Sequence, residues 1–412
     1  MKILIVTQYF WPEEFRINEM SRMLVQRGHQ VTVLTGLPNY PAGRFFPGYG
    51  LRQNRRQNYE GVEVVRVPLI PRGKSSPLRL ALNYFSFAFM AALLGPSKCP
   101  GRYDVIFVYE PSPITVGLPA ICLKKKKSAP LIFWVQDLWP ESLSAIGAVR
   151  AKFILNRVGS LVRYIYHRCD LILVQSKVFI EAIAELSIPT GKIKYFPNSA
   201  EEIFDGKGGP NGNVDRLTFP DGFRLMFAGN IGAAQDFETI LKAAELTKER
   251  EDIHWIIVGD GHLSPWVKAQ VQSRGLQNTF HLMGRHPLED MPAFFARADA
   301  MLVTLKKDPI FALTIPGKVQ SYLACSRPII AALDGEGARI IEEAGAGLTC
   351  PAEDPEVLAK TILKVYHMPR EEREKMARLG RDYFEKNFER QLLLNRLEGW
   401  FLKLSRNEEP CV

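Results

Sequence analysis

Short apolar runs alternate with helix-like segments along most of the chain. In the first half these runs lie at Met1–Gln8, Gln30–Thr35, Val62–Val67, Val105–Tyr109, Leu131–Gln136 and Leu171–Gln175. In the second half they lie at Arg224–Ala228, Ile253–Val258, Phe280–Met283, Ala300–Leu305 and Pro328–Leu333. The runs are rich in β-branched residues and nearly continuous, which is typical of strands buried on both faces of a parallel sheet. The pattern predicts an α/β protein with doubly wound, Rossmann-like sheets.

The alternation stops near residue 200, where a polar stretch rich in Gly, Pro and Asn spans Asp205–Asp221. A chain of 412 residues is also too long for one hydrophobic core. We therefore expect an N-terminal domain over residues 1–200 and a C-terminal domain over residues 201–381. A last helical segment, residues 382–412, carries large aromatic side chains and is expected to pack on either domain or to cross back to the first.

The charge is unevenly distributed. The formal net charge is +9, and the first 200 residues hold 26 Lys and Arg against 12 Asp and Glu. A basic half indicates an anionic partner, and a nucleic acid, an anionic membrane or a pyrophosphate-linked substrate would all fit. The six cysteines are widely spaced without a CxxC pair, which favours reduced thiols in a cytosolic protein over disulfides or zinc. No secretory signal is recognised at the start.

Ligands of doubly wound sheets bind beyond the carboxyl ends of the strands, and two such places stand out in the first half. In Thr7–Asn18 the side chains of Glu14, Arg16 and Asn18 precede or open a helix and could reach a ligand, although an ordinary capped loop fits equally well. In Phe133–Glu141, Asp137 follows a strand among Trp and Pro residues. Its carboxylate is suited to orienting or deprotonating an acceptor hydroxyl, the alternative being a turn cap.

Two further places lie in the second half. The glycines of Phe227–Asp236 and of Gly259-Asp260-Gly261 permit a close backbone approach to a ligand, although plain tight turns explain them as well. The segment Thr314-Ile315-Pro316-Gly317-Lys318 predicts a helix start with free amides and a cation where a diphosphate would bind. Arg285 is expected to reach the same face. The alternative is a solvated lysine on a capped helix.

Other residues have simpler explanations. His29 is expected to pack between helix and strand, and His254, His281 and His286 lack the spacing of metal ligands. Because the sequence has no acidic metal motif such as DxD, no metal is expected. The uncharged stretch Leu80–Ser97 predicts either a buried helix or one that dips into a membrane surface. Val149–Arg168 mixes basic and apolar residues as interfacial helices do, which favours peripheral membrane binding.

Several of these segments resemble family 4 glycosyltransferases of the GT-B type. They occur in the family's order across nearly the whole chain: RGHQVTVLTG (27–36), FAGN (227–230), IVGDG (257–261), Gly284-Arg285 and ACSRPIIA (324–331). The segments PNYPAGRFFPGY, WVQDLWPES and IPGKVQSYLA are similar to a bacterial subgroup that builds O-antigen or capsule repeats. That subgroup includes transferases of N-acetyl-fucosamine and related amino sugars.

The resemblance implies two domains facing each other across a cleft, the second binding a nucleotide sugar and the first an acceptor. It implies a retaining, metal-independent reaction without a cofactor, in which Asp137, Lys318 and Arg285 carry the catalysis. The donor is expected to be a UDP-sugar, and the residues expected to bind it are Gly229, Asn230, Gln235, Gly259, Asp260, Gly261, Gly284, Arg285, His286, Thr314, Ile315, Pro316, Gly317, Lys318, Ser321 and Tyr322. Those expected to bind the acceptor are Glu14, Arg16, Asn18, Asn39, Tyr40, Gln136 and Trp139.

The chain also departs from the family pattern. Many members carry two glutamates eight residues apart, where this chain has Leu313 and Ser321, so a ribose-binding carboxylate is missing. The family's arginine and lysine after the FAG strand are Asn230 and Gln235 here, and a histidine before the aspartate is Gln136. Lys318 and Arg285 are therefore expected to meet more of the diphosphate charge.

The function expected is transfer of an N-acetylated sugar from a UDP-linked donor to a polyprenyl-pyrophosphate-linked saccharide during surface polysaccharide or lipopolysaccharide synthesis. The protein is expected to be cytoplasmic, bound to the inner face of the cell membrane, and not a partner of nucleic acid. One alternative is a sugar-nucleotide 2-epimerase of the same architecture. Another is a basic protein without enzymatic activity that binds membrane or RNA.

Overall fold

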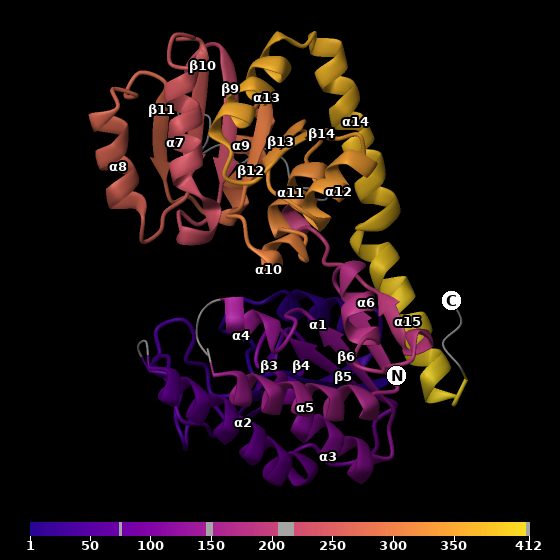
Figure 1. Cartoon of the computed structure of the whole chain (residues 1–412). Coiled ribbons are helices and arrows are strands. Elements are labelled where there is room, and N and C mark those ends of the chain that lie inside the picture. The colour runs from indigo at the N-terminus through magenta and orange to yellow at the C-terminus, as the bar shows by residue number, and fades with distance from the viewer. Residues whose placement is uncertain (74–75, 146–150, 205–217, 409–412) are drawn as a thin grey trace. The chain divides into compact units, whose positions relative to one another are not determined.

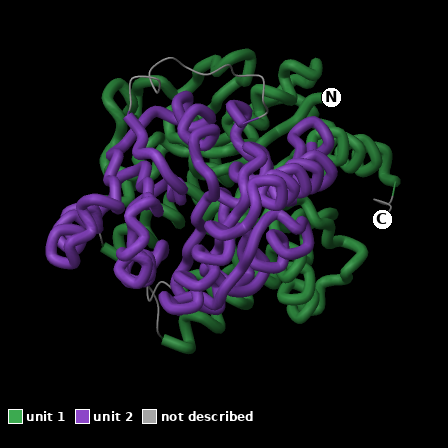
Figure 2. The backbone as a smooth tube through the Cα atoms, turned by 90° about the horizontal axis from the view of Figure 1, so that it is seen from above, with its two compact units in different colours: residues 1–196, 394–412 green, residues 197–393 purple. Residues whose placement is uncertain are grey.

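The computed structural model describes residues 1–73, 76–145, 151–204 and 218–408, and it divides into two compact units. Unit 1 comprises residues 1–196 and 394–412, and unit 2 comprises residues 197–393 (Figure 2). The chain passes from unit 1 to unit 2 at Pro197, close to the expected position near residue 200. The linker predicted at Asp205–Asp221 lies mostly outside the described residues.

Unit 1 is built on an eight-stranded sheet with the order β3-β4-β2-β1-β5-β6-β7-β8. All neighbours are parallel except β3 and β4, which form an antiparallel pair at one edge. The central strands are buried along their whole length because helices cover both faces. The strands are β1 (Lys2–Val6), β2 (Gln30–Gly36), β3 (Arg56–Tyr59), β4 (Val62–Val67), β5 (Val105–Glu110), β6 (Leu131–Val135), β7 (Leu171–Val174) and β8 (Ile193–Tyr195).

The helices of unit 1 include a group of three, α2, α3 and α5, in which α3 packs against both of the others (Figure 1). Helix α2 is uncharged over most of its length, and it buries Asn83, Phe87, Ala88, Ala91 and Gly95 along one side. The helices are α1 (Arg16–Gln26), α2 (Pro77–Lys98), α3 (Gly117–Lys127), α4 (Glu141–Ala145), α5 (Lys152–Arg168) and α6 (Val178–Ala184).

Unit 2 has a six-stranded, wholly parallel sheet in the order β11-β10-β9-β12-β13-β14. Alternate residues of its strands supply two separate hydrophobic cores, with Met226 and Ile256 on one face and Leu225 and Trp255 on the other. The strands are β9 (Phe223–Ala228), β10 (Ile253–Val258), β11 (Phe280–Gly284), β12 (Ala300–Thr304), β13 (Ile329–Ala332) and β14 (Gly347–Cys350). The helices are α7 (Phe237–Leu246), α8 (Ser264–Ser273), α9 (Met291–Ala296), α10 (Pro309–Ala312), α11 (Gly317–Ala324), α12 (Glu336–Glu343), α13 (Pro355–His367) and α14 (Arg370–Asn387).

The C-terminal segment returns to unit 1. Helix α14 ends at Asn387, and α15 (Arg390–Ser405) carries the chain back, so the expected tail is two helices. In unit 1 the ring of Phe401 lies 5.4 Å from that of Phe107, and Trp400 lies 5.8 Å from Phe196. Glu398 accepts hydrogen bonds from Arg27 and pairs with His29. Residues from the end of α15 therefore complete the core of unit 1.

The fold class predicted from the apolar pattern is confirmed, and every predicted strand is present. Three short strands were not predicted: β3, β8 and β14. Helix α1 begins at Arg16, after Glu13, whose carboxyl is turned inward and accepts hydrogen bonds from the main-chain amides of Asn39 and Tyr40.

Candidate active site

The ends of strands β9 and β10 in unit 2 approach each other through two glycines. Gly229, after β9, has φ +140°, and a Cβ atom on it would lie 2.7 Å from Cε of Lys318. Gly259, after β10, has φ +142°, and a Cβ atom there would lie 1.9 Å from the carbonyl oxygen of Gly229. At Gly259 the clash is with the main chain, so no side chain fits there, whereas at Gly229 the end of the Lys318 side chain would have to move. The glycines therefore let the two strand ends approach each other and leave room for Lys318 across the end of β9, and an approach to a ligand stays a prediction.

The ammonium group of Lys318 is held by two neighbours. Its Nζ donates a hydrogen bond to Oε1 of Gln235, and it lies 3.6 Å from the centroid of the Phe227 ring. Burial lowers the pKa of Lys318 to about 7. An anion beside this amine would stabilise its protonated form, so the site is suited to an anionic ligand.

Lys318 also stands at the start of α11, where the main chain offers further donors. The helix follows Pro316 and has no side-chain cap. The Val319 amide bonds the Pro316 carbonyl at 2.9 Å, whereas among the described residues the amides of Gly317 and Lys318 have no partner. Free amides at a helix start and an adjacent cation form an anion site. The structure thus brings together Gly229, Gln235, Gly317 and Lys318.

The Gly261 and Asn230 turns pack against each other. A Cβ atom on Gly261 would lie 2.7 Å from Oδ1 of Asn230, and one on Gly232 would lie 2.4 Å from its Nδ2. Asp260 accepts hydrogen bonds from Ser264 and from the Gly261 amide, and these two bonds lower the pKa of its exposed carboxyl. These contacts make a tight, well-ordered turn beside the lysine site.

Arg285 and His286 follow β11, next to this turn. The Gly259 amide bonds the Gly284 carbonyl at 2.8 Å, so the ends of β10 and β11 are joined. Arg285 is exposed, and its charge contributes to lowering the pKa of Asp260. His286 faces the Met283 carbonyl at 3.1 Å, and its ring lies 4.7 Å from that of Phe294. At the carboxyl ends of these strands, Arg285 thus lies beside β11 and Lys318 beside β9.

Tyr322 was predicted to approach a ribose, but its position does not allow this. The side chain is 1% exposed, and its hydroxyl accepts from the Ala228 amide at 3.0 Å. Burial raises its pKa well above the ordinary value. Tyr322 therefore fixes the end of β9 to α11 from inside the core. Ile315 is likewise buried, whereas the hydroxyl of Thr314 donates to the Phe311 carbonyl at 3.2 Å and shapes the loop before α11.

In unit 1 a buried carboxyl lies beside the predicted aspartate. Asp137 follows β6, and burial raises its pKa to about 6. Glu110, the last residue of β5, is fully buried on the neighbouring strand, and its carbonyl accepts from the Gln136 amide at 3.1 Å. Burial raises the pKa of Glu110 far above its ordinary value, and the charge of Asp137 raises it further. Glu110 was missed because the apolar run was taken to end at Tyr109.

The first loop of unit 1 is held by Glu13. Its Oε1 accepts hydrogen bonds from the amides of Asn39 and Tyr40, each at 2.7 Å, so it joins the loop after β1 to the loop after β2. Burial raises its pKa to about 7, although these amides and the charge of Arg66 act in the opposite direction. A buried, fixed carboxyl of this kind organises the loops.

Two predicted acceptor residues are corrected. Asn39 is fully buried, and its Oδ1 accepts from the Arg72 amide at 3.0 Å. Asn18 is also buried, and its amide bridges the Trp11 amide and the Glu13 carbonyl. Both side chains brace loops and do not present a polar group to a ligand. Sequence alone does not distinguish a bracing asparagine from a binding one.

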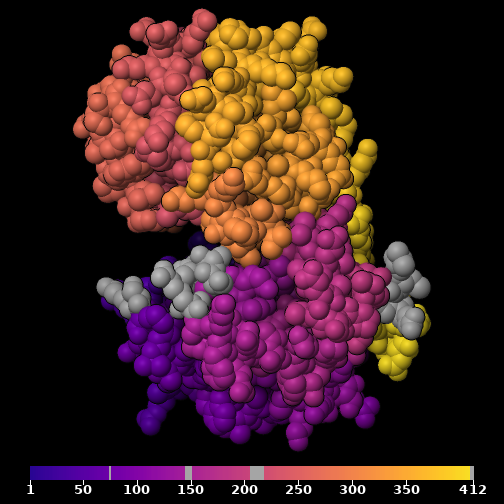
Figure 3. Space-filling view, in the orientation of Figure 1, coloured from indigo at the N-terminus to yellow at the C-terminus, as the bar shows by residue number. Residues whose placement is uncertain are grey.

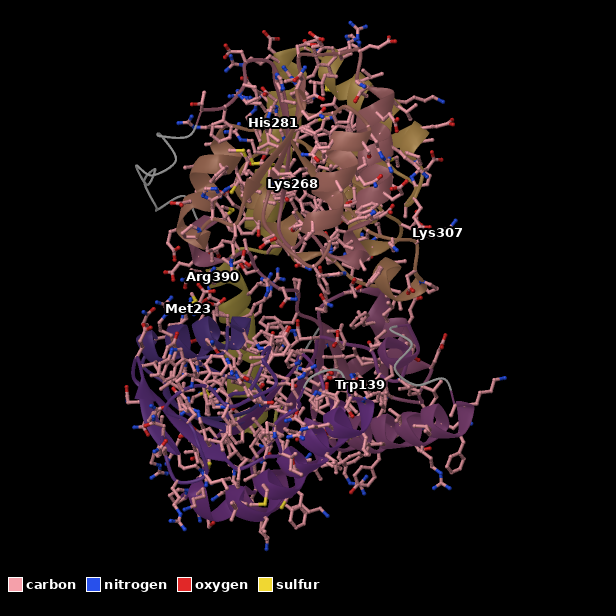
Figure 4. All side chains as sticks on the ribbon, turned by 90° about the vertical axis from the view of Figure 1, so that its left-hand side faces the viewer. Met23, Trp139, Lys268, His281, Lys307 and Arg390 are labelled. Atoms are coloured by element: carbon pink, nitrogen blue, oxygen red, sulfur yellow. The ribbon has the colours of Figure 1, made fainter. Side chains whose placement is uncertain are left out.

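Of the other predicted acceptor residues, Glu14, Arg16 and Tyr40 are at least partly exposed, whereas Gln136 and Trp139 are buried. Glu14 is exposed, Arg16 is partly exposed, and Tyr40 is 39% exposed with its ring between Tyr9 and Phe15. Trp139, labelled in Figure 4, is mostly buried, and its ring lies 6.3 Å from that of Tyr84. Gln136 is mostly buried, and its carbonyl accepts from Gln175 at 3.0 Å. A role in acceptor binding stays a prediction for these five residues.

Comparison with known proteins places each unit in a known group. Residues 14–199 match the family model "Glycosyl transferase 4-like domain", and residues 222–368 match "Glycosyl transferases group 1". The two matches together span most of the chain and leave the linker between them. The chain belongs to the family 4 glycosyltransferases.

Among relatives of this glycosyltransferase is the probable glycosyltransferase WbjE of Pseudomonas aeruginosa, 30% identical over 56% of this chain and 58% of the relative. The alignment thus spans under two thirds of that relative. Another is WcaI of Escherichia coli, a putative colanic acid biosynthesis glycosyl transferase, 26% identical over 79% of this chain and 81% of the relative. Among solved structures, HepE of Anabaena in complex with UDP has a TM-score of 0.68 at 14% identity, covering 98% of this chain and 100% of that one. This last likeness shows the shared GT-B fold.

One departure of this glycosyltransferase from the family pattern has a structural counterpart. The position where a carboxylate was missing, Ser321, donates its hydroxyl hydrogen to Oε2 of Glu201 at 2.9 Å. Glu201 lies far away in sequence, just after unit 2 begins. A carboxylate therefore does lie beside α11, although it comes from another segment. No motif in the sequence connects the two residues.

Three histidines have side-chain partners within the described residues. His254 and His281 lie on neighbouring strands β10 and β11, with their ring nitrogens 3.2 Å apart (His281 is labelled in Figure 4). His29 pairs with Glu398 of α15. These side chains belong to the frame of each unit.

Proposed function

We propose that this glycosyltransferase moves an N-acetylated sugar from a UDP-linked donor to a lipid-linked saccharide during synthesis of a bacterial surface polysaccharide. The observation that carries the proposal is the anion site of unit 2, where Lys318 and the two free amides of α11 face the glycine-lined strand ends. The names of WcaI and of the UDP complex of HepE support the pathway class and the nucleotide. The transfer would retain anomeric configuration and need no metal ion.

In this proposal, the anion site stabilises the leaving group. When the anomeric C–O bond breaks, negative charge grows on the β-phosphate while the sugar becomes oxocarbenium-like. Donors fixed in advance stabilise that charge most in the transition state, each by about 3–4 kcal/mol. Lys318 and the Gly317 amide supply such donors beside Gly229, and Arg285 would add charge from the end of β11.

Glu201 is proposed to take the place of the missing ribose carboxylate. Its carboxylate accepts from Ser321, and this bond fixes its position beside α11. A ribose hydroxyl is a good donor to such a carboxylate. The proposal predicts that Glu201 contributes to nucleotide affinity and not to the chemical step.

In unit 1, Asp137 is proposed to orient the acceptor hydroxyl. The hydroxyl attacks from the side of the leaving group, and its proton passes to a phosphate oxygen. Asp137 then acts as a hydrogen-bond acceptor in its charged form, which its pKa of about 6 allows at neutral pH. The buried Glu110 behind it would keep the negative charge on Asp137 by remaining protonated itself.

Peripheral binding to the inner face of the cell membrane is proposed to occur through α2 and α5. Helix α2 is long and apolar enough to cross a membrane by length and composition, with a mean hydropathy of 1.4 and 28% of that stretch buried. One side packs on unit 1, and the other exposes Leu78, Leu82, Phe85, Phe89 and Leu93. These positions recur every three or four residues, so they form a continuous stripe, which we call the α2 stripe. A helix packed on one side and apolar on the other fits the surface of a bilayer better than a span through it.

Helix α5 adds basic residues to this surface. Phe153 and Ile154 are exposed at its start, and Arg157 and Arg163 are exposed along it. Figure 3 shows this helix on the surface of unit 1. Basic side chains near an anionic leaflet contribute roughly 1 kcal/mol each.

The proposed function is tested by incubating the full chain with a panel of UDP-sugars and a polyprenyl-pyrophosphate-linked saccharide. Transfer of one sugar with release of UDP is the expected result. Incubation with the UDP-sugars alone is the second arm, in which an epimerised nucleotide sugar would favour the epimerase. Absence of binding to every UDP-sugar would refute the proposal and leave a protein without this activity.

Membrane binding is tested by co-sedimentation with vesicles of phosphatidylglycerol and phosphatidylethanolamine at rising salt. We expect binding that weakens with salt and that is lost in Phe89→Ser/Leu93→Ser. Leu246→Ser/Leu288→Ser, which changes exposed apolar residues of unit 2, is the matched control. Equal binding of both double variants would contradict the role of α2.

A further inference from the structure

Unit 1 contains a cavity of about 390 Å³ between α2 and α5. Its volume falls within the range of roughly 300–1,000 Å³ found for small-molecule sites. The walls are almost entirely carbon, and they include Leu80, Ala81, Ile114, Val158 and Leu161. An apolar space of this size is unexplained by the donor chemistry of unit 2.

One end of the cavity reaches the proposed acceptor site. Trp139 and Tyr84 line it, and their rings lie 6.3 Å apart. Trp139 is two residues from Asp137 in the loop that follows β6. A molecule lying in the cavity therefore ends close in sequence and in space to the loop of the carboxylate that orients the acceptor.

The rim also carries a cation. Arg72 lines the cavity, and its guanidinium lies 5.0 Å from the ring centroid of Tyr40 and 3.4 Å from the Tyr9 hydroxyl. Tyr9 and Tyr40 belong to the loops after β1 and β2, at the same strand-end edge as Asp137. A guanidinium held at the mouth of an apolar space is matched to a ligand with an anionic head and a hydrocarbon tail.

The other side of the cavity is continuous with the α2 stripe. Phe85 lines the cavity and is also 58% exposed, so the space opens on the surface proposed to meet the membrane. A lipid chain could pass from the bilayer into the cavity without crossing water. The arrangement thus places a membrane-facing opening, an apolar slot, a cation and a carboxylate loop in one unit.

We propose that this cavity binds the first isoprene units of the lipid that carries the acceptor, with Arg72 beside the pyrophosphate. The inference rests on the proposed function for the identity of the lipid, and it deepens that function by naming the part of the protein that recognises the chain. It also gives Trp139 a role, as a wall of the lipid slot and not as a sugar contact.

The test measures binding of farnesyl pyrophosphate and of inorganic pyrophosphate to the full chain by calorimetry. Because each buried CH₂ adds about 0.8 kcal/mol, we expect the farnesyl compound to bind at least about tenfold more tightly. Ala81→Phe and Val158→Phe fill the cavity and should reduce its affinity to that of pyrophosphate. Leu93→Phe, on the same helix but outside the cavity, is the control and should bind as the wild type does. Circular dichroism and thermal unfolding should match the wild type in all three variants, which reports that unit 1 folds, and UDP binding by unit 2 should be unchanged.

The outcomes separate this inference from the function on which it rests. Transfer to the lipid-linked saccharide, together with farnesyl pyrophosphate binding that the filling variants leave unchanged, would overturn the cavity proposal alone. Binding that is lost on filling, in a protein that transfers no sugar, would support the cavity and refute the proposed function. Equal affinity for dodecylphosphocholine would show that the cavity takes membrane lipid in general, and it would overturn the assignment to the acceptor.

Discussion

The strand ends of the two units carry different chemical groups: hydrogen-bond donors in unit 2 and carboxyl groups in unit 1. In unit 2 the edge is made of glycines, free amides and cations that include Lys318 and Arg285, so much of its chemistry comes from the main chain. In unit 1 the same edge carries the buried carboxyls of Glu13 and Glu110 and the partly exposed carboxyl of Asp137, among aromatic rings. A site that binds a diphosphate needs donors and a close backbone approach, whereas a site that receives a hydroxyl needs acceptors. Under the proposed function, one edge would serve the donor and the other the acceptor of the same transfer reaction.

The largest effect is expected from Lys318→Met, which removes the cation from the unit 2 edge. Turnover should fall by about 10²–10³-fold, because removing one fixed donor to a developing negative charge typically lowers turnover by that factor. The melting temperature should not fall, because the variant also removes the cost of burying an ammonium group. Lys268→Met, on the exposed face of α8 (labelled in Figure 4), is the control and should leave turnover unchanged. A folded Lys318→Met enzyme of full activity would end the proposed role.

Asp137→Asn removes the carboxylate proposed to orient the acceptor in unit 1, and it should have the second largest effect on turnover. General acid–base and orienting groups contribute about 10²-fold or more, so turnover should fall by about that factor while UDP affinity stays the same. Burial raises the pKa of Asp137 to about 6, so its carboxylate form is lost below that pH, and wild-type kcat/KM should decline as pH falls through 6. The variant should lack this decline. Asp170→Asn, at the opposite end of the same sheet, should retain it.

Gly229→Ala sharpens the comparison, because it changes only the backbone approach in unit 2. Its Cβ atom would meet Cε of Lys318, so the lysine must move, and we expect UDP to bind about tenfold more weakly. Gly28→Ala, in unit 1, is the matched control, since φ there is +86° and nothing lies within 4 Å of the added Cβ. Both variants should lose about 1–2 kcal/mol of stability through the positive φ. Equal UDP affinity in the two would show that the position of Lys318 is unimportant.

The smallest expected effect is the uptake of a proton by Lys318 when UDP binds. Burial lowers the pKa of free Lys318 to about 7, so at pH 8 the amine is mostly neutral, and a bound diphosphate should charge it. At pH 8 the complex should therefore take up about one proton from solution when UDP binds, and at pH 6 it should take up almost none. Calorimetry in buffers of different ionisation enthalpy measures this uptake. Lys318→Met should show none at either pH, and an uptake equal to that of the wild type would place the titrating group elsewhere.

The sequence was most informative where local chemistry decides the structure. Continuous apolar runs predicted both sheets, and Pro316-Gly317-Lys318 predicted the start of α11, because proline and glycine act on the main chain directly. What sequence could not provide were the partners of buried polar groups. Asn39 and Tyr322 were expected at ligands and instead hold loops and strands together. Glu110 and Glu201 reach their sites from strands and segments that only the folded chain brings close.

The return of α15 to unit 1 sets the order in which the protein can mature. Phe107, Phe196 and Arg27 contact Phe401, Trp400 and Glu398, which leave the ribosome more than 200 residues after Phe196. Nascent unit 1 must spend that interval with an uncovered apolar surface while unit 2 is still being synthesised. Expression of residues 1–196 alone should therefore give an aggregating fragment, which a separately added α15 peptide would rescue.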